Sequence, residues 1–275
     1  MFINFYTPFT SSTLLTLKSS RIGITDSVLS NSKLGGRPPR YIIFYSYKAS
    51  RIYKQNISSS GGGGTVFFLH NDLHSGKTMT LLFSDTRTNA RFLPRQVSDS
   101  VPFSSDKLPE ILNRFSVKPK TTEAGTIRNV LEDCEIPKIK GEDKYCAVSL
   151  ESLVDFVTSK LGHRVKVIST EIKTKTKLQK YEILEGIKMI GEKQVVCHKL
   201  GYAYAVFMCH TIDPTQAYMV PLMGSDGSKV EGVAVCHMDS SDWSPEHYAF
   251  QQLRVKPGAS ICHFLNIAVL VWLQN

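Results

Sequence analysis

Four Cys-His dipeptides in the last third of this 275-residue chain restrict what it can fold into. They are Cys197-His198, Cys209-His210, Cys236-His237 and Cys262-His263, separated by 10, 25 and 24 residues. They contain four of the six cysteines and four of the eight histidines. Because a β-strand directs successive side chains to opposite faces, a dipeptide in a strand places its sulfur on one face and its imidazole on the other. The repeat predicts a sheet that can be cross-linked on one side and carries histidines on the other.

The residues around the dipeptides favour strands. Short apolar runs rich in β-branched residues precede three of them, at 195–196, 205–208 and 233–235. Turn-forming residues interrupt these runs at Gly201, 213–214, 224–227 and 257–258. Apolar runs bounded by Gly, Pro and Asp are typical of strands, so we expect a β-rich C-terminal half.

The pattern resembles the BURP domain, a plant-specific family whose signature is four spaced Cys-His pairs near the C-terminus. Other family motifs are also present: Phe67-Phe68, Asp72-Leu73-His74 with Gly76, Phe92-Leu93-Pro94-Arg95, Cys134, Lys144-Tyr145-Cys146-Ala147, Leu150-Glu151-Ser152, and Trp243 with Pro245 and His247. The resemblance extends from about Phe67 to His263 and therefore covers most of the chain. Within the family, the chain is most similar to the dehydration-responsive branch.

The expected fold class is α+β, a BURP-type domain with short helices in its N-terminal half and a β-rich, disulfide-stapled C-terminal half. The clearest helix is predicted over 150–161, where apolar residues recur at helical spacing, Ser149 can cap the start and Gly162 can close the end. Further helices are predicted near 109–115 and 127–131, and strands over 80–83, 164–168 and 181–187.

The positive charge of the chain is concentrated at its N-terminus. Residues 1–64 carry eight Lys/Arg and one acidic residue, a net charge of +7, and the remainder carries +2. Nucleic-acid binding needs a basic face on the folded part, so we expect no nucleic-acid partner. We predict a basic, disordered leader over 1–64, ending in a Ser/Gly linker, and a BURP domain over 65–275. No run of 18 apolar residues occurs, so no transmembrane segment is expected.

The N-terminal residues bear on where the protein acts. BURP proteins are secretory, so the resemblance implies an extracellular or apoplastic location, or at least the secretory pathway. Residues 1–17 depart from this expectation, because Thr, Ser and Pro8 interrupt the apolar run that a signal peptide requires. Asn56, in Asn56-Ile57-Ser58, matches a glycosylation sequon, which would fit secretion.

The six cysteines lack the Cys-x2-Cys spacing of zinc fingers and ribbons, so such a site is not expected. A local disulfide between Cys134 and Cys146 is one interpretation, and the BURP resemblance favours it. The family also implies two more disulfides, formed among Cys197, Cys209, Cys236 and Cys262. Six cysteines allow fifteen pairings, and the sequence does not choose among them. The alternative is six reduced, buried cysteines in a cytosolic protein.

The repeated histidines suggest metal ligands. If the sulfurs form disulfides, imidazole nitrogens must hold the metal, and nitrogen-rich sites favour Cu(II). BURP domains that act as peptide cyclases carry copper on the histidines of these motifs. The resemblance therefore implies copper ligands at His198, His210, His237 and His263. His74 and His247 lie in other family motifs and are second candidates, and a structural role in the core is the alternative.

One departure from the family follows the last dipeptide. The family continues with Pro-Glu-Asp-His, whereas residues 266–269 here are Asn, Ile, Ala and Val. If the missing histidine completes the copper shell or orients a ligand, copper binding or turnover would be weaker in this chain.

The sequence is compatible with two functions. One is a secreted protein with a copper site, acting in the cell wall or apoplast in stress or development, with a wall polysaccharide or wall protein as partner. The alternative is an autocatalytic peptide cyclase, which uses copper and dioxygen to cross-link Tyr or Trp of a core peptide. The leader contains no core ending in Trp, and its one tyrosine-rich stretch is 41–53. Together with the altered residues 266–269, this favours the non-enzymatic function slightly.

Overall fold

The structure, a computed structural model, describes residues 67–83, 89–172 and 177–275. The expectations for the leader over 1–64, the sequon at Asn56 and the tyrosine-rich stretch lie outside these residues. The described part is α+β, with two antiparallel sheets and short helices, and its C-terminal half is β-rich. This confirms the predicted fold class.

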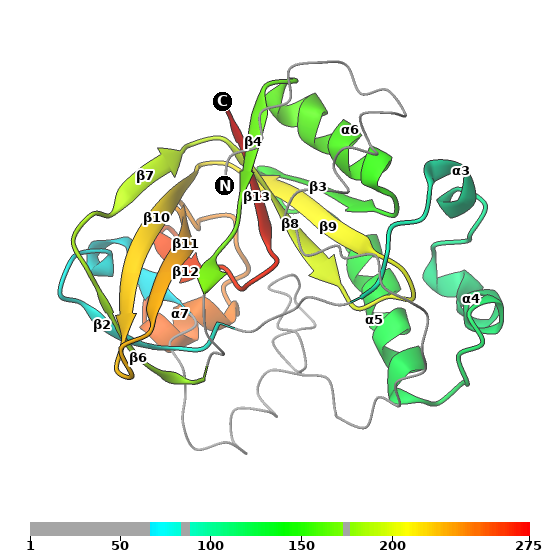
Figure 1. Ribbon diagram of the computed structural model, residues 1–275, viewed down its shortest axis with the longest axis horizontal. Coiled ribbons are helices and arrows are strands. Elements are labelled where there is room, and N and C mark those ends of the chain that lie inside the picture. The colour runs from blue at the N-terminus through cyan, green and yellow to red at the C-terminus, as the bar shows by residue number, and fades with distance from the viewer. Residues whose placement is uncertain (1–66, 84–88, 173–176) are drawn as a thin grey trace.

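Two sheets organise the described residues (Figure 1). The eight-stranded sheet has the order β1 (Phe68–Leu69), β12 (Ile261–Phe264), β11 (Lys229–His237), β10 (Thr215–Gly224), β6 (Gln179–Ile183) and β2 (Thr78–Leu81), with β5 (Glu171–Ile172) paired to β11 and β7 (Lys188–Gly191) to β10. The five-stranded sheet has the order β3 (Glu142–Ala147), β9 (Val206–Ile212), β8 (Gln194–Leu200), β13 (Leu270–Gln274) and β4 (Val165–Ile168).

Helices lie beside both sheets (Figure 1). They are α3 (Arg95–Ser98), α4 (Leu108–Arg114), α5 (Thr122–Glu135), α6 (Leu150–Leu161) and α7 (Tyr248–Leu253), with 3-10 turns η1 (His70–Asp72) and η2 (Ser105–Lys107). Helices α3 to α6 lie on the side of the five-stranded sheet, and α7 lies by the eight-stranded sheet. None of the helices in the described ranges is long and apolar enough to span a membrane.

Helix α6 shows how local sequence sets an element. It covers the predicted residues, Leu150–Leu161. The hydroxyl of Ser149 accepts from the backbone N–H of Ser152, and the Ser152 hydroxyl accepts from the backbone N–H of Ser149, which satisfies two amides of the first turn. Gly162 ends the helix at a φ of 77°, a region that glycine adopts at little cost. The buried stripe of α6 includes Leu153 and Val157 and packs against the five-stranded sheet.

Other boundaries differ from the predictions by a few residues. The predicted strand over 181–187 is β6, which ends at Ile183 because the chain then turns through Gly186 at a φ of 99°. The predicted helices near 109–115 and 127–131 are α4 and the longer α5. Helix α7 and strand β13 were not predicted, since each is shorter than seven residues and has no periodic pattern of its own.

The four Cys-His dipeptides lie in two sheets rather than in one. Strands β8 and β9 of the five-stranded sheet carry the first two, and β11 and β12 of the eight-stranded sheet carry the last two. One apolar cluster joins the sheets, because Val196 and Val271 of the five-stranded sheet pack with Val233 and Val235 of the eight-stranded sheet. The sheets therefore face each other across this cluster.

Candidate metal centre

Disulfides fix the register of both strand pairs. Cys197 lies directly opposite Cys209 on β8 and β9, and Cys236 lies directly opposite Cys262 on β11 and β12. Each pair forms a disulfide with a Cα–Cα distance of 4.0 Å. The third disulfide joins Cys134 of α5 to Cys146 of β3. All six cysteines thus form disulfides, in one of the fifteen possible pairings.

The sulfurs point away from the interface between the sheets. Cys197 and Cys209 are buried in the apolar cluster that contains the stripe of α6. Cys236 and Cys262 are buried in a different cluster on the eight-stranded sheet, with Phe68 among its members. Because side chains alternate along a strand, the histidine after each cysteine points to the opposite face, which is the face turned toward the other sheet. The predicted segregation of sulfur and imidazole therefore holds within each strand pair.

The four imidazoles form two stacked pairs. The rings of His198 and His210 have centroids 5.3 Å apart and are inclined by 16°, and their Nε2 atoms are 3.2 Å apart. The rings of His237 and His263 have centroids 5.6 Å apart and are inclined by 24°. His210, His237 and His263 are only 5–7% exposed.

Both pairs lie on strand faces turned toward the other sheet, and charges on the other three histidines would lower the pKa of His210. We therefore call the four imidazoles the histidine cluster (His198, His210, His237 and His263). Burial lowers the pKa of His198 and of His237 to about 3, and that of His263 to about 4. The pKa of His210 also lies well below its usual value, because of burial and then of the three other histidines of the cluster. All four rings are therefore neutral near pH 7, and a neutral imidazole can offer one nitrogen lone pair to a metal.

The spacing of the first pair fits two ligands of one ion. Two nitrogens bound to a tetrahedral metal at about 2.0 Å lie roughly 3.3 Å apart, and the Nε2 atoms of His198 and His210 are 3.2 Å apart. Over the described ranges, however, no group of three or more His, Cys, Asp or Glu side chains is already arranged to hold a metal. The donor chemistry thus fits copper, and the assignment of all four histidines as its ligands stays a prediction.

The two second candidates lie in different places. His74 is exposed, and its Nδ1 lies 2.9 Å from the carbonyl oxygen of Ser75. A charge on His247 would lower the pKa values of His237 and His263, so His247 lies beside the histidine cluster. Its Nδ1 accepts a hydrogen bond of 3.2 Å from the backbone N–H of Ala249 and so caps helix α7.

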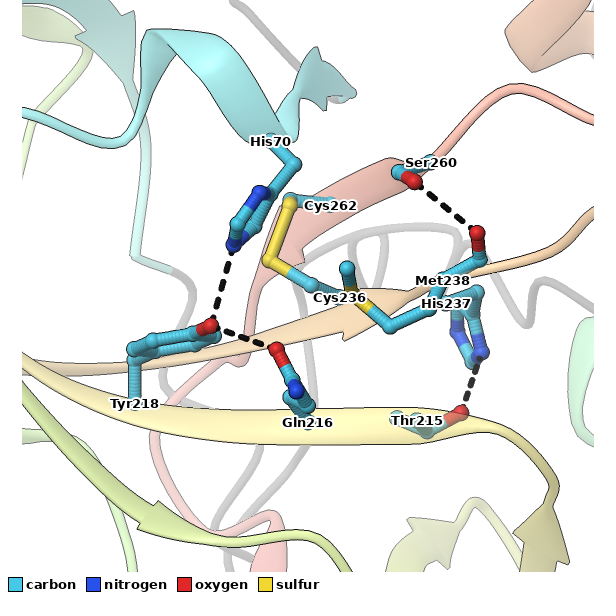
Figure 2. Close-up of a disulfide and its surroundings, with 9 residues drawn as sticks. All are labelled: His70, Thr215, Gln216, Tyr218, Cys236, His237, Met238, Ser260 and Cys262. Carbon is cyan, nitrogen blue, oxygen red and sulfur yellow. Dashed lines mark hydrogen bonds between the residues drawn. A yellow bond between two sulfur atoms is a disulfide. The ribbon is translucent and has the colours of Figure 1, made fainter.

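Three neighbours of the histidine cluster were not singled out as site residues from the sequence. The hydroxyl of Thr215 is hydrogen-bonded to His237 (Figure 2), and its oxygen lies 2.9 Å from Nδ1 of the ring. The indole ring of Trp243 lies 5.1 Å from the ring of His237. Lys144 is paired with His210 across β3 and β9 and contributes to its lowered pKa. Lys144 and Trp243 belong to motifs that carry the resemblance, whereas nothing in the sequence marks Thr215.

A cleft of about 760 Å³ is lined by residues that adjoin His237 and by none of the four histidines. Its wall includes Glu192, Lys193, Asp213, Thr215 and Met238. Thr215 contacts His237, and Met238 follows His237 in the chain. A molecule in this cleft would therefore lie beside the strand that carries one of the four histidines.

Comparison with known proteins decides the family. A sequence profile described as "BURP domain" matches residues 66–274. The chain belongs to the BURP family. Its relatives include plant proteins from rice, Arabidopsis thaliana and wheat.

Three relatives illustrate the similarity. "BURP domain-containing protein 3" of Oryza sativa subsp. japonica is 47% identical over 217 residues, which cover 76% of this chain and 51% of the relative. "BURP domain protein RD22" of Arabidopsis thaliana is 42% identical over 247 residues, covering 87% and 62%. "Protein RAFTIN 1A" of Triticum aestivum is 37% identical over 245 residues, covering 84% and 62%. The chain thus spans between half and two thirds of these relatives.

The departure from the BURP pattern after the last dipeptide has a structural counterpart. Residues 266–269 form the turn between β12 and β13, closed by a hydrogen bond of 3.3 Å from the N–H of Val269 to the carbonyl of Asn266. Val269, where the resemblance leads us to expect a histidine, is buried in the apolar cluster between the sheets. This position therefore adds packing and no nitrogen ligand.

Proposed function

We propose that this BURP protein is a secreted copper-binding protein of the cell wall or apoplast, with a role in stress or development. The histidine cluster carries the copper part of the proposal, because two Nε2 atoms lie 3.2 Å apart and two further neutral imidazoles face them from the other sheet. The three disulfides support an oxidising compartment, where such bonds persist. The similarity to RD22 supports the assignment to the dehydration-responsive branch.

The protein's own residues determine what a bound ion would meet. His198, His210, His237 and His263 would hold the copper, which supplies redox chemistry between Cu(II) and Cu(I) when bound. Lys144 places a positive charge near His210, and its Nζ donates to the carbonyls of Asp133 and Ile136 at distances of 3.1 and 2.7 Å. The low exposure of His210, His237 and His263 limits the access of water to these three rings.

Copper titration of ligand variants tests the proposal. The double variant His198→Gln/His210→Gln is expected to bind Cu(II) about 100-fold more weakly than the wild type, because it removes the pair whose spacing fits one ion. Isothermal titration of disulfide-intact protein measures the affinity, and thermal unfolding verifies that the variant folds. The exposed His74→Gln is the matched control and should keep the wild-type affinity. Equal affinity in the double variant and the wild type would contradict the copper assignment.

A second function, autocatalytic peptide cyclisation, is favoured by one observation. The ring of Phe67, the first described residue, lies 6.0 Å from the ring of His263 and 5.7 Å from that of His247. The residues before Phe67 are therefore joined to the domain at the edge of the histidine cluster. Tyr53 precedes Phe67 by 14 residues, a tether that spans up to about 50 Å when extended. Such a tether would give the tyrosines a high effective concentration at the cluster.

Peptide mapping distinguishes the two functions. The full chain is loaded with Cu(II) in air and compared with a metal-free, anaerobic sample. Cyclisation predicts that a tyrosine-bearing peptide from residues 41–53 loses two hydrogen atoms, which dioxygen takes up as hydrogen peroxide. Copper retained without a mass change would assign the chain to the non-enzymatic function, or to action on a separate peptide.

A further inference from the structure

Thr215 is placed to control one histidine of the cluster. It is the first residue of β10 and lies directly opposite His237 of β11. The two side chains lie on the same side of the strand pair, with Oγ1 2.9 Å from Nδ1 (Figure 2). Thr215 is only 4% exposed and His237 only 5% exposed, so bulk water competes little for this hydrogen bond.

The partner of Nδ1 decides what Nε2 can do. A neutral imidazole carries one proton, so a ring that binds a metal through Nε2 must carry the proton on Nδ1 and donate it to an acceptor. A threonine oxygen can accept that proton, and Thr215 is therefore compatible with metal binding through Nε2 of His237. The hydrogen bond leaves Nε2 as the nitrogen available on this ring.

His247 shows the opposite arrangement next to the same cluster. Its Nδ1 accepts from the backbone N–H of Ala249, which can only donate, so the proton of the neutral ring is on Nε2. His247 could bind a metal through Nε2 only by giving up its role as the cap of α7. Both rings lie near Trp243, but their hydrogen bonds give them different roles. His237 can act as a metal ligand, whereas His247 caps α7.

Thr215 is itself held from the other sheet. Its carbonyl oxygen accepts a hydrogen bond of 3.1 Å from Nε2 of Gln194, a residue of β8 that is 6% exposed. Gln194 begins the strand that carries His198 four residues later. Through these two hydrogen bonds, Thr215 links β8, which bears His198, to the side chain of His237. Thr215 therefore connects the two halves of the histidine cluster.

We infer that Thr215 is a positioning residue of the copper site: its hydroxyl accepts the Nδ1 proton of His237 and so fixes Nε2 as the nitrogen that faces the metal. This inference rests on the proposed function and deepens it by adding a residue outside the Cys-His motifs. The hydroxyl contacts the ligand and not the ion.

Two variants at this position test the inference. Thr215→Val keeps the shape of the side chain and removes the acceptor, and it is expected to weaken Cu(II) binding about 10- to 100-fold. Thr215→Ser keeps the hydroxyl and should retain the wild-type affinity. Thermal unfolding verifies that both variants fold. Loss of affinity in both variants, or in neither, would overturn the inference.

Nitrogen NMR gives a readout that a purely structural role would not change. In protein with ¹⁵N-labelled histidine, the wild type should show His237 with its proton on Nδ1, both without metal and with Zn²⁺ as a diamagnetic substitute. Thr215→Val should lose this preference in the metal-free protein. Zinc bound through Nδ1 of His237 in the wild type would also overturn the inference, even if the valine variant failed to fold.

Copper titration and nitrogen NMR together distinguish a failure of the proposed function from a failure of the inference about Thr215. A wild type that binds neither Cu(II) nor Zn²⁺ would refute the proposed function, whereas the metal-free spectrum would still show whether Thr215 sets the proton position on His237. A wild type that binds copper, with a valine variant that binds it equally well, would refute only the role of Thr215. His163→Gln, which changes an exposed ring outside the candidate ligands, is the control, and its copper affinity should be unchanged.

Discussion

Metal-free protein is expected to lose several kilocalories per mole of stability when the pH falls from 7 to 5. The histidines of the cluster have folded-state pKa values lowered by burial, to about 3 for His198 and His237 and about 4 for His263. In the unfolded chain each titrates near 6.5. Below pH 6.5 the unfolded state therefore binds more protons than the folded state, and the free energy of unfolding decreases as the pH falls.

The size of the effect follows from the same values. Each such histidine contributes up to about 2 kcal/mol between pH 6.5 and pH 5, at about 1.4 kcal/mol per pH unit. The loss should continue until the folded-state pKa values of about 3 to 4 are reached. Urea unfolding of chelator-treated protein at pH 7, 6 and 5, followed by circular dichroism, measures it. The exposed His74→Gln variant, measured in the same way, is the control.

A flat stability profile between pH 7 and pH 5 would contradict the buried, neutral state of the four rings. Addition of Zn²⁺ or Cu²⁺ should stabilise the folded state at pH 7 by mass action, because the ion binds the folded cluster in preference to the unfolded chain. At lower pH the stabilisation should shrink, since protons compete with the metal for the same nitrogens.

The second prediction compares two disulfides. The double variant Cys197→Ala/Cys209→Ala should lower the free energy of unfolding by about 3 kcal/mol, because the disulfide closes a short loop in the unfolded chain. It should also weaken copper binding, since this disulfide fixes the register of the strands that carry His198 and His210. Urea unfolding and copper titration measure the two effects.

The matched control has the same sequence separation. Cys134 and Cys146 are also 12 residues apart, but their disulfide joins α5 to β3 and does not connect two histidine-bearing strands. Cys134→Ala/Cys146→Ala should therefore cost a similar amount of stability, about 3 kcal/mol, and leave copper affinity unchanged. If both double variants lost copper equally, general destabilisation rather than strand register would explain the loss.

Local signals made much of the fold predictable. Helix α6 was predicted at its observed bounds because Ser149, the apolar spacing and Gly162 act within a few residues of one another. The strands of the Cys-His dipeptides were predictable for the same reason, since alternation is a local property. Strand β13 was missed, because its short apolar run forms a strand through pairing with β8 and β4, which are distant in sequence.

The candidate site was predictable in its residues and not in its arrangement. The dipeptides identified the four histidines, but nothing local shows that two sheets bring them together or which cysteines pair. The hydrogen bonds that distinguish His237 from His247 depend on Thr215 and Ala249. Thr215 lies 22 residues before His237, and its role arises from the pairing of β10 with β11.

The outward position of the sulfurs has a consequence for how the protein matures. Reduced cysteines would present six soft thiols that bind Cu(I) tightly and compete with imidazole. Once the three disulfides form, no thiol remains and the inward-facing nitrogens are the ligands left to the ion. The proposed copper site therefore requires an order in time, with oxidation of the chain first and arrival of the ion afterwards. Copper that met the nascent, reduced chain would be held by the wrong atoms.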